Sequence, residues 1–419
     1  MIEYAQALEI LLAQTVRLPA EPCLRGDAVT RVLTDTIISP IALPSYDHAA
    51  MDGYALMASK PLSVGSEYLV YGSQAAGDVA RRAQTISEAG GACEIMTGAR
   101  LPDGLDTVVA IEQTECVDRN ADGMPARIRL LAPLGAGDNV RYAGSDVRLG
   151  AEVLSAGTRI ASSQIMLLAA LGISSVSVVR RTRVAIICTG KELQADSSRP
   201  LTAERIHNSN GPYLHAALRS AGAEVLSCET VDDTAVTYAE ALQRAVDAGA
   251  DLIISTGAVS MGRFDFVPAT LRQFDAQLLF HKVAMRPGKP LLCARLADGP
   301  LVIALPGTPM AVAAGLRFVV IPVLRAMDGQ GSEPTRVAVL DTPQTPKAGL
   351  RHFLRATFHQ GGDGRLHAAV STEQQPFRIL PFAHSDGWVV LPENAGVCAA
   401  GTSVEIVSLE PGSPWHASA

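Results

Sequence analysis

The chain has 419 residues, 48% of them hydrophobic, and is too long for a single core, so we expect about two to four domains. A net charge of −7 and an aromatic content of 5% argue against a nucleic-acid-binding protein, which needs a basic surface or stacking platforms. The seven cysteines form no Cys-x-x-Cys pair and their number is odd, which indicates a reduced, cytoplasmic protein without a zinc knuckle or a disulfide framework.

The N-terminal sequence lacks the basic region and long apolar core of a signal peptide. The most apolar stretch, residues 301–327, is interrupted by prolines, a glycine and an arginine, so we expect no membrane span.

Residues 4–16 carry apolar side chains at helical spacing and predict an amphipathic helix. Residues 25–44 are turn-rich and extended.

Between residues 45 and 146, short apolar runs alternate with Gly, Pro and Asp turns. The expected strands lie at 68–71, 93–96, 108–112 and 126–131. This pattern predicts a small β module, which a linking segment follows to about residue 177.

From residue 184 the pattern changes to buried strands that alternate with helices. The expected strands are 184–188, 224–230, 252–255 and 301–305, and the expected helices are 212–221, 234–248 and one from about 310. Alternation of this kind predicts a parallel sheet with crossover helices. Because a loop follows each strand at its carboxyl end, we expect a ligand site along that edge of the sheet.

After about residue 333 the pattern returns to strands and predicts a terminal β domain. The expected strands are 336–340, 353–358, 366–370, 388–391 and 403–407, with a hairpin turn at 361–364. The nine histidines show no metal-ligand spacing along the sequence.

Four loops carry acidic residues beside glycines: 51–54, 189–192, 231–233 and 260–265. Three of them follow strands of the predicted sheet, so Glu192, Asp232 and Asp265 are expected to converge. Converging carboxylates repel one another unless a cation such as Mg²⁺ lies between them. The alternative is that these acids are helix caps and turn formers. Asp232 and its neighbour Asp233 are equally placed for either role.

Two further segments predict an anion site. Lys282, Arg286 and Lys289 lie within eight positions, beside a Pro-Gly turn, and could neutralise an oxyanion or a pyrophosphate. Pro306 and Gly307 precede a helix and could aim free backbone N–H groups at an anion. The alternatives are a solvated charged hairpin and an ordinary strand-to-helix connection. No P-loop or dinucleotide-binding glycine motif is present.

Taken together, these loops resemble the molybdopterin molybdenumtransferases, the family of bacterial MoeA and the gephyrin E domain. The most specific match is residues 44–55, PSYDHAAMDGYA. Further matches follow in family order at 96–104, 138–146, 189–193, 208–212, 255–262, 286–290 and 305–307. The likeness runs from about residue 5 to about residue 408.

The resemblance implies an α/β multidomain fold with a MogA-like molybdopterin-binding domain. The implied domains are a discontinuous helix/linker domain at 1–44 and 147–177, an inserted β domain at 45–146, the α/β domain at 178–328 and a β-barrel-like domain at 329–419. It also implies a homodimer, whose site lies between the α/β domain of one protomer and residues 51–53 of the other. A MogA-type adenylyltransferase and apo-molybdoenzymes or cofactor carriers are the implied partners.

The implied reaction is Mg²⁺-dependent insertion of molybdenum from molybdate into adenylylated molybdopterin, with release of AMP. By resemblance, Asp52, Glu192, Asp232 and Asp265 would hold Mg²⁺, Lys282 and Arg286 would neutralise molybdate or phosphate, and Thr97 and Asp146 would complete the opposite wall. The implied cofactor-binding residues are Thr189, Gly190, Ser209, Asn210, Gly257, Ser260, Gly262, Pro287, Gly288, Lys289, Pro306, Gly307 and Arg351.

The chain departs from the family pattern at a few positions. They are Ala258 in place of a second glycine, Thr308 in place of asparagine, Arg286 where lysine is commoner, and Gln375-Pro376 where a Gly-Ser pair is expected. These departures leave one alternative open, a weakened paralogue that acts as a pterin carrier or an interaction scaffold.

Overall fold

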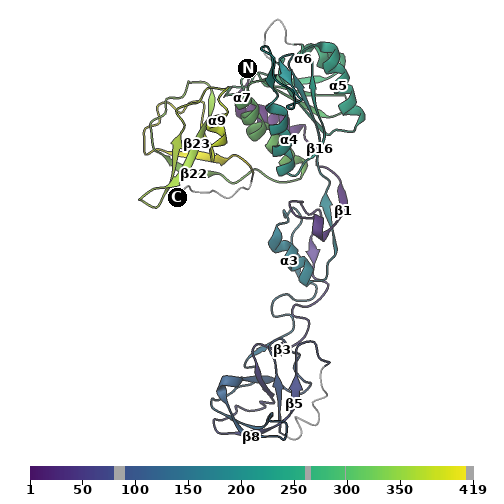
Figure 1. Ribbon diagram of the computed structural model, residues 1–419, viewed down its shortest axis with the longest axis vertical. Helices are drawn as coiled ribbons and strands as arrows, with labels where there is room; N and C mark the ends of the chain where they lie inside the picture. Colours follow the sequence, from purple (N-terminus) through teal and green to yellow (C-terminus); the bar gives the residue numbers. More distant parts are fainter. Residues whose placement is uncertain (80–89, 260–265, 298, 412–419) are drawn as a thin grey trace. The chain divides into compact units, whose positions relative to one another are not determined.

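The computed structural model describes residues 1–79, 90–259, 266–297 and 299–411 (Figure 1). The chain forms two compact units. Unit 1 comprises Met1–Pro22, Thr30–Thr34 and Ser177–Ala419, and unit 2 comprises Cys23–Val29 and Asp35–Val176. The strands β1 (Ala20–Leu24) and β12 (Ser175–Val179) pair with each other where the chain crosses between the units.

A six-stranded mixed sheet forms the centre of unit 1. Its order is β16 (Glu224–Val231), β13 (Arg183–Thr189), β17 (Leu252–Thr256), β21 (Leu301–Leu305), β20 (Leu292–Arg295) and β18 (Gln277–His281). The first four strands are mutually parallel, as the sequence predicts, and β20 pairs antiparallel with both β21 and β18, so that β20 alone runs opposite to the other five strands. The sequence did not predict this antiparallel pair.

Helices cover both faces of the sheet (Figure 1). Alternate side chains of β13 point to opposite faces, so Val184 and Ile186 lie in one core and Ala185 and Ile187 in the other. The first core is covered by α1 (Tyr4–Ala13), α4 (Asn210–Ser220), α7 (Pro309–Gly315) and α8 (Ile321–Met327), and the second by α5 (Ala235–Asp247) and α6 (Val267–Gln273). The sequence assigned residues 4–16 to the helix/linker domain, whereas α1 packs into the core of unit 1.

The apolar segment Pro309–Met327 is long and hydrophobic enough to cross a membrane, but 83% of its most apolar window is buried. A π-helical turn, Leu316–Val320, joins α7 to α8 without interruption. Burial of Met310, Val312, Val320 and Leu324 in the first core identifies the segment as a core helix. The expectation that it does not span a membrane agrees with this packing.

The C-terminal part of unit 1 is a closed five-stranded barrel. Its strands are β22 (Arg336–Leu340), β23 (Arg351–Gln360), β24 (Leu366–Val370), β25 (Gly387–Leu391) and β26 (Ser403–Ser408). The sheet order with the additional β23–β25 pairing closes the barrel. The short strand β19 (Met285–Arg286) joins its edge beside β23, and α9 (Leu380–Ala383) precedes β25. Phe353 and Trp388 of the barrel extend the first core of unit 1.

Unit 2 contains a second six-stranded sheet. Its order is β7 (Thr107–Ala110), β4 (Gly53–Leu56), β6 (Ala92–Ile95), β5 (Glu67–Gln74), β9 (Pro125–Leu130) and β8 (Thr114–Arg119). Outside this sheet, β2 (Ile37–Ile38) pairs with β11 (Glu152–Leu154), next to the helix α3 (Ser162–Ala170). The β2–β11 pairing joins the chain before and after the β module, so the two segments that flank this module lie side by side.

Candidate functional site

The loops that follow four parallel strands lie along one edge of the unit 1 sheet. In the order of the strands, they begin at Asp232 after β16, Gly190 after β13, Gly257 after β17 and Pro306 after β21. Hydrogen bonds join neighbouring loops: the Gly190 amide donates to the Val231 carbonyl (3.3 Å) and the Gly257 amide to the Leu305 carbonyl (3.0 Å). The predicted ligand edge is therefore a continuous backbone surface.

Close packing at Gly257 excludes any side chain there. Gly257 has a φ of +93°, and a Cβ at this position would lie 2.6 Å from the Thr189 hydroxyl and 2.7 Å from the Thr189 carbonyl oxygen. The Thr189 hydroxyl donates a hydrogen bond to the Thr256 carbonyl, at 3.2 Å. The next residue, Ala258, has a φ of +50°, a left-handed conformation that favours glycine. The alanine that departs from the family pattern is thus a strained residue.

Two asparagines fix the start of α4 against this edge. The Asn208 amide donates to the Thr230 hydroxyl (2.9 Å), and its carbonyl accepts the Gly211 amide (3.0 Å). The buried Asn210 donates to the Gly307 carbonyl at 2.7 Å. Ser209 lies between them and is exposed. Asn208 was not among the predicted site residues, although it belongs to the matching segment 208–212.

Two acids of the edge, Glu192 and Asp232, are exposed. Within the described part of the chain, the carboxylates of Glu192 and Asp232 make no hydrogen bond or ion pair. Thr234, not Asp232, caps α5, because its side chain accepts the Thr237 amide. The cap interpretation is therefore wrong for Asp232. Asp265, Ser260 and Gly262 lie outside the described residues. The convergence of Asp265 with Glu192 and Asp232, and the binding roles of Ser260 and Gly262, therefore stay predictions.

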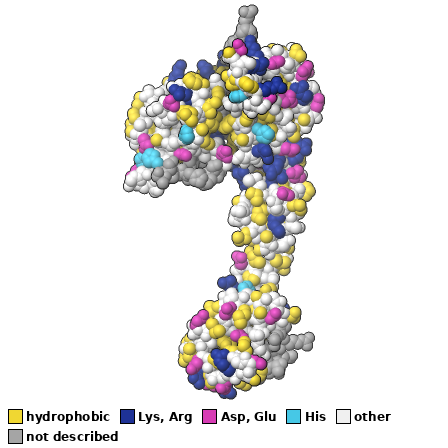
Figure 2. Space-filling model, in the orientation of Figure 1, with side chains coloured by type: hydrophobic (Ala, Val, Ile, Leu, Met, Phe, Trp, Pro, Cys, Tyr) yellow, Lys and Arg dark blue, Asp and Glu magenta, His cyan; other side chains and the backbone are white. Residues whose placement is uncertain are grey.

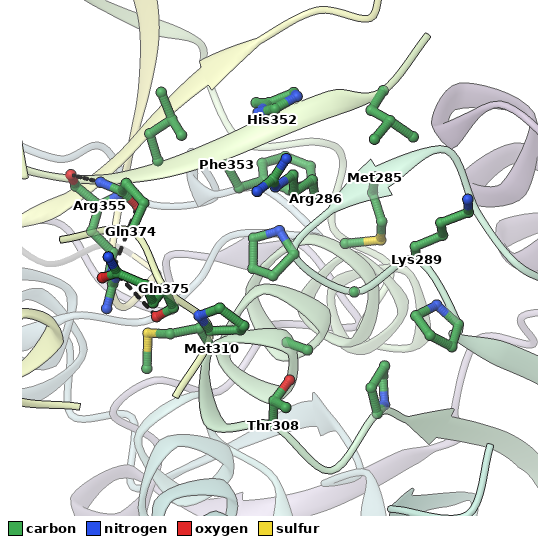
Figure 3. Close-up of a pocket in the computed structure, with 18 of the residues that line it drawn as sticks. Met285, Arg286, Lys289, Thr308, Met310, His352, Phe353, Arg355, Gln374 and Gln375 are labelled. Atoms are coloured by element: carbon green, nitrogen blue, oxygen red, sulfur yellow. Dashed lines mark hydrogen bonds between the residues drawn. The ribbon is translucent and has the colours of Figure 1, made fainter. Parts of the chain in front are cut away.

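A cavity of about 700 Å³ lies between the Gly257 and Gly307 loops and the barrel (Figure 3). This volume is in the range of small-molecule sites. Predicted site residues on its wall are Arg286, Pro287, Gly288, Lys289, Pro306 and Gly307. Arg286 and Lys289 are exposed cations, so the cavity wall carries positive charge. Lys282 is half-buried, has a φ of +70°, and is not part of this wall.

The first N–H groups of α7 are not free to bind an anion, as the sequence had suggested. The Met310 amide donates to the Pro376 carbonyl at 3.0 Å, and the amides of Ala311 and Val312 donate to the Thr308 carbonyl at 2.9 and 3.1 Å. Pro309 has no N–H group. For these three amides the expectation does not hold, because a barrel loop distant in sequence accepts the first and the Thr308 carbonyl accepts the other two.

The same barrel loop is held by Arg355, which is 1% exposed. Its guanidinium donates to the carbonyls of Arg378 (2.6 Å) and Glu373, and the Gln374 side chain accepts its backbone amide at 3.2 Å (Figure 3). Burial lowers the pKa of Arg355, and the Glu373 carboxylate opposes this effect. Arg355 therefore lines the cavity and also holds the loop that forms part of its wall.

Arg351, a predicted cofactor-binding residue, has internal partners. It donates to Glu393 at 3.3 Å and lies 4.9 Å above the centre of the Tyr4 ring. Its neighbours Leu350 and His352 line the cavity, but Arg351 does not. Arg351 lines a different cavity instead, together with Tyr4 and Glu405.

His352 is a cavity residue that the sequence analysis missed. It is 6% exposed, pairs with Arg286 across β19 and β23, and accepts the Lys347 amide through Nε2 at 3.0 Å. Burial lowers the pKa of His352, and the nearby positive charge of Arg286 lowers it further. The ring is therefore neutral at neutral pH. The register of β19 with β23 could not be read from a two-residue strand.

In unit 2 the matching segments meet around Asp52. The Asp52 carboxylate accepts the amide and the hydroxyl of Thr97, both at 2.7 Å, and these hydrogen bonds lower its pKa. Ala49 exchanges backbone hydrogen bonds with Gly98 and Ala99, and β3 (His48–Ala49) pairs with β10 (Val140–Arg141). The exposed Asp146 carboxylate has no internal partner among the described residues. The structure thus brings Asp52 and Thr97 into direct contact.

Family models match three consecutive parts of the chain. They are the MoeA N-terminal region (domains I and II) at residues 2–172, a probable molybdopterin-binding domain at 185–326 and the MoeA C-terminal region (domain IV) at 337–409. A molybdopterin molybdenumtransferase of Synechococcus elongatus is 33% identical over 98% of this chain and 100% of its own length. The chain belongs to the molybdopterin molybdenumtransferase family. It is therefore an enzyme of molybdenum cofactor biosynthesis, a transferase.

Other relatives agree. Molybdopterin molybdenumtransferase 2 of Mycobacterium tuberculosis is 34% identical and covers 90% of this chain and 92% of its own. The crystal structure of a molybdopterin biosynthesis MoeA protein from Pyrococcus horikoshii is 25% identical, covers 98% of this chain and 99% of its own, and superposes with a TM-score of 0.79. This likeness confirms the expected fold class over the whole chain.

Proposed function

We propose that this chain inserts molybdenum from molybdate into adenylylated molybdopterin, with Mg²⁺ as cofactor and AMP as the released product. The observation that carries the proposal is the edge of the unit 1 sheet, where the matching loops follow four adjacent strands beside a cavity lined by Arg286 and Lys289. Both substrates are anions, since molybdate is an oxyanion and the pterin carries a pyrophosphate. Local cations are needed to hold them, because the chain as a whole is acidic.

The donor set fits Mg²⁺, which prefers oxygen ligands. Among the described residues, the carboxylates of Glu192 and Asp232 have no partner that would compete for them, and the lowered pKa of Asp52 keeps it ionised. Asp265 is proposed as the fourth acid. Mg²⁺, when bound, would act as a Lewis acid on the phosphoanhydride.

The protein's own groups bind and orient the substrates. Arg286 and Lys289 neutralise the oxyanion and phosphate oxygens at the cavity, and we assign Lys282 to the same task. The tight turn at Gly257 lets backbone approach the ligand closely, and Asn210 holds the Gly307 loop in place. Thr97 orients Asp52 through two hydrogen bonds, and Asp146 belongs to the same wall in our proposal.

We further propose that the active form is a cytoplasmic homodimer in which Asp52 of one protomer completes the Glu192 edge of the other. The remaining proposed cofactor contacts come from Ser209, Ser260, Gly262 and Arg351. The proposed partners are a MogA-type adenylyltransferase, which supplies the substrate, and apo-molybdoenzymes or carriers, which receive the product. The four-domain division given by the sequence also stays a proposal.

The test uses purified protein with adenylylated molybdopterin, Mg²⁺ and molybdate. We expect AMP release coupled to metal insertion, and its loss in Asp52→Ala and in Glu192→Ala. Glu240→Ala, which removes an exposed carboxylate of α5, is the matched control and should keep full activity. Pterin binding without AMP release would instead favour the alternative that the chain is a pterin carrier. Consumption of ATP would favour an adenylyltransferase.

Mixing the two inactive variants tests the shared site. In a mixed dimer, one site combines both lesions and the other combines intact Asp52 with intact Glu192. Random exchange of subunits should therefore restore about a quarter of the wild-type activity, because half of the dimers are mixed and half of their sites are intact. If both residues act within one protomer, no activity returns.

A further inference from the structure

One end of the C-terminal barrel carries a cluster of metal-ligating side chains outside the site described above. Asp341, His359 and His367 each offer one ligand atom, and these atoms lie within 4.8 Å of one another. His367 Nδ1 is 3.0 Å from Asp341 Oδ1, and His359 Nε2 is 3.7 Å from Asp341 Oδ2. Figure 2 shows histidine side chains at the surface of the barrel.

The three residues come from three adjacent strands or strand ends. His359 of β23 and His367 of β24 are direct partners in the antiparallel register, so their rings share one face of the sheet. Asp341 follows β22, which runs parallel to β24, and its amide donates to the Ala368 carbonyl at 3.2 Å. The cluster is therefore built on paired strands, which hold ligand side chains more rigidly than loops do.

The hairpin turn between β23 and β24 leaves room for the His367 ring. A Cβ at Gly361 would lie 2.5 Å from His367 Nε2 and 2.8 Å from Asp363 Oδ1. Only glycine therefore permits this packing at position 361. Asp363 Oδ1 lies 3.2 Å from His367 Nε2, so the turn supplies a carboxylate to the outer nitrogen of the ring.

This arrangement prepares His367 Nδ1 as a ligand. When Nε2–H donates to Asp363, the lone pair of the neutral ring is on Nδ1, which faces Asp341. Histidine ligands of metals commonly donate their other N–H to a carboxylate in this way. The alternative is an ordinary cluster of ion pairs. That alternative needs only His367 to be protonated, since Asp341 and Asp363 both raise its pKa, and a metal ion at Nδ1 would take the place of that proton.

We propose that Asp341, His359 and His367 bind a divalent transition-metal ion, with Zn²⁺ as the probe. Zn²⁺ bonds of about 2.0–2.2 Å to nitrogen and oxygen imply ligand atoms about 3.3 Å apart in a tetrahedral site. The two measured separations, 3.0 and 3.7 Å, bracket that value. Two imidazoles and one carboxylate favour such an ion over Mg²⁺, which prefers oxygen ligands.

The bound ion would tie the hairpin turn of β23 and β24 to the end of β22. The His359 side chain is 44% exposed, so the ion can enter from solvent and keep a water as its fourth ligand. The site is independent of the proposed molybdenum insertion, because its residues do not line the cavity and none belongs to the acidic edge.

The test measures Zn²⁺ binding to the full-length, chelator-treated chain by calorimetry, and Co²⁺ binding by visible absorption. Excess Mg²⁺ occupies the oxygen-ligand site, and the exposed thiols Cys116 and Cys228 are alkylated beforehand. We expect one ion per chain. His359→Ala and His367→Ala should each weaken binding at least about tenfold, since each removes one of three protein ligands.

His384→Ala is the matched control, because His384 is an exposed histidine of the same barrel outside the cluster. It should bind Zn²⁺ like the unsubstituted chain. The ion should also raise the melting temperature of the unsubstituted chain but not that of His359→Ala, whose exposed position makes a folding defect easy to exclude. Absence of binding, or equal binding by both cluster variants and the control, would overturn the proposal.

Discussion

The strained backbone at Ala258 gives a prediction whose size follows from the structure. A left-handed conformation costs a non-glycine residue about 1–2 kcal/mol, and Ala258→Gly removes that cost. Glycine also raises the entropy of the unfolded chain, which destabilises the protein by about 0.4–1 kcal/mol. Loss of the half-buried methyl group removes part of the ~0.8 kcal/mol of a buried carbon. The net change for this single variant is therefore close to zero.

A matched alanine separates the strain from the entropy. Ala203 is exposed, lies in a turn closed by the Arg205 amide and the Thr202 carbonyl (3.2 Å), and has no positive φ. Ala203→Gly carries the same entropic cost without relief of strain. We therefore expect the free energy of unfolding of Ala258→Gly to exceed that of Ala203→Gly by about 1 kcal/mol.

Urea unfolding followed by circular dichroism, or by the fluorescence of the buried Trp388, measures this difference. In a domain of 150–250 residues, 1 kcal/mol corresponds to about 2–4 °C in melting temperature. Equal losses of stability in the two variants would refute the strain at Ala258. A gain in Ala203→Gly would refute the assumed entropy cost.

Three further predictions concern two residues of the cavity, His352 and Arg355, and the contact between Thr97 and Asp52. Burial holds the pKa of His352 below 6.5, so the folded state favours the neutral ring. The stabilisation that results is complete above pH 6.5 and is lost as the pH falls below it. In melting curves recorded across pH, His352→Gln should therefore lack this pH-dependent part of the stability. Arg355→Met should cost about 2–4 kcal/mol, measured by urea unfolding, since it removes charged donors from several carbonyls, and an unchanged midpoint would contradict that role. Thr97→Val should raise the Mg²⁺ concentration needed for AMP release about tenfold without changing the rate at saturating Mg²⁺. The reason is that it removes one hydrogen bond that orients the Asp52 carboxylate but leaves that carboxylate ionised. A rate loss that Mg²⁺ does not restore would contradict the positioning role of Thr97.

The sequence predicted those elements that have turn residues at both ends. The bounds of β21, β22 and β24 agree with the structure because glycine, proline or aspartate follows or precedes each apolar run. The antiparallel strands β18 and β20 were missed, because they flank the charged segment 281–290, where no periodicity separates strand from loop. Local pattern identifies a strand, but its direction depends on partners elsewhere in the chain.

The order of strands and loops along the chain determines part of the candidate site, and that part could be predicted from the sequence. Loops after parallel strands must share an edge, so the placement of Asp232, Gly190 and Gly257 followed from the strand pattern alone. Partners from distant segments were not predictable: Pro376 occupies the Met310 amide. The histidine cluster was missed for a related reason. His359 and His367 have no metal-ligand spacing along the chain, and a turn at 361–364 would pair residue 359 with residue 366, whereas the observed register places His359 opposite His367.

The departures from the family pattern are scattered in the sequence but not in space. Ala258, Thr308, Arg286 and the pair Gln375-Pro376 all line the one cavity beside the sheet edge. Their loops touch: a Cβ at Gly307 would lie 3.5 Å from the Gly257 Cα, and the Pro376 carbonyl holds the first amide of α7. Residues that share such contacts have coupled energetics. The substitutions are therefore better understood as one altered wall than as independent losses of catalytic groups.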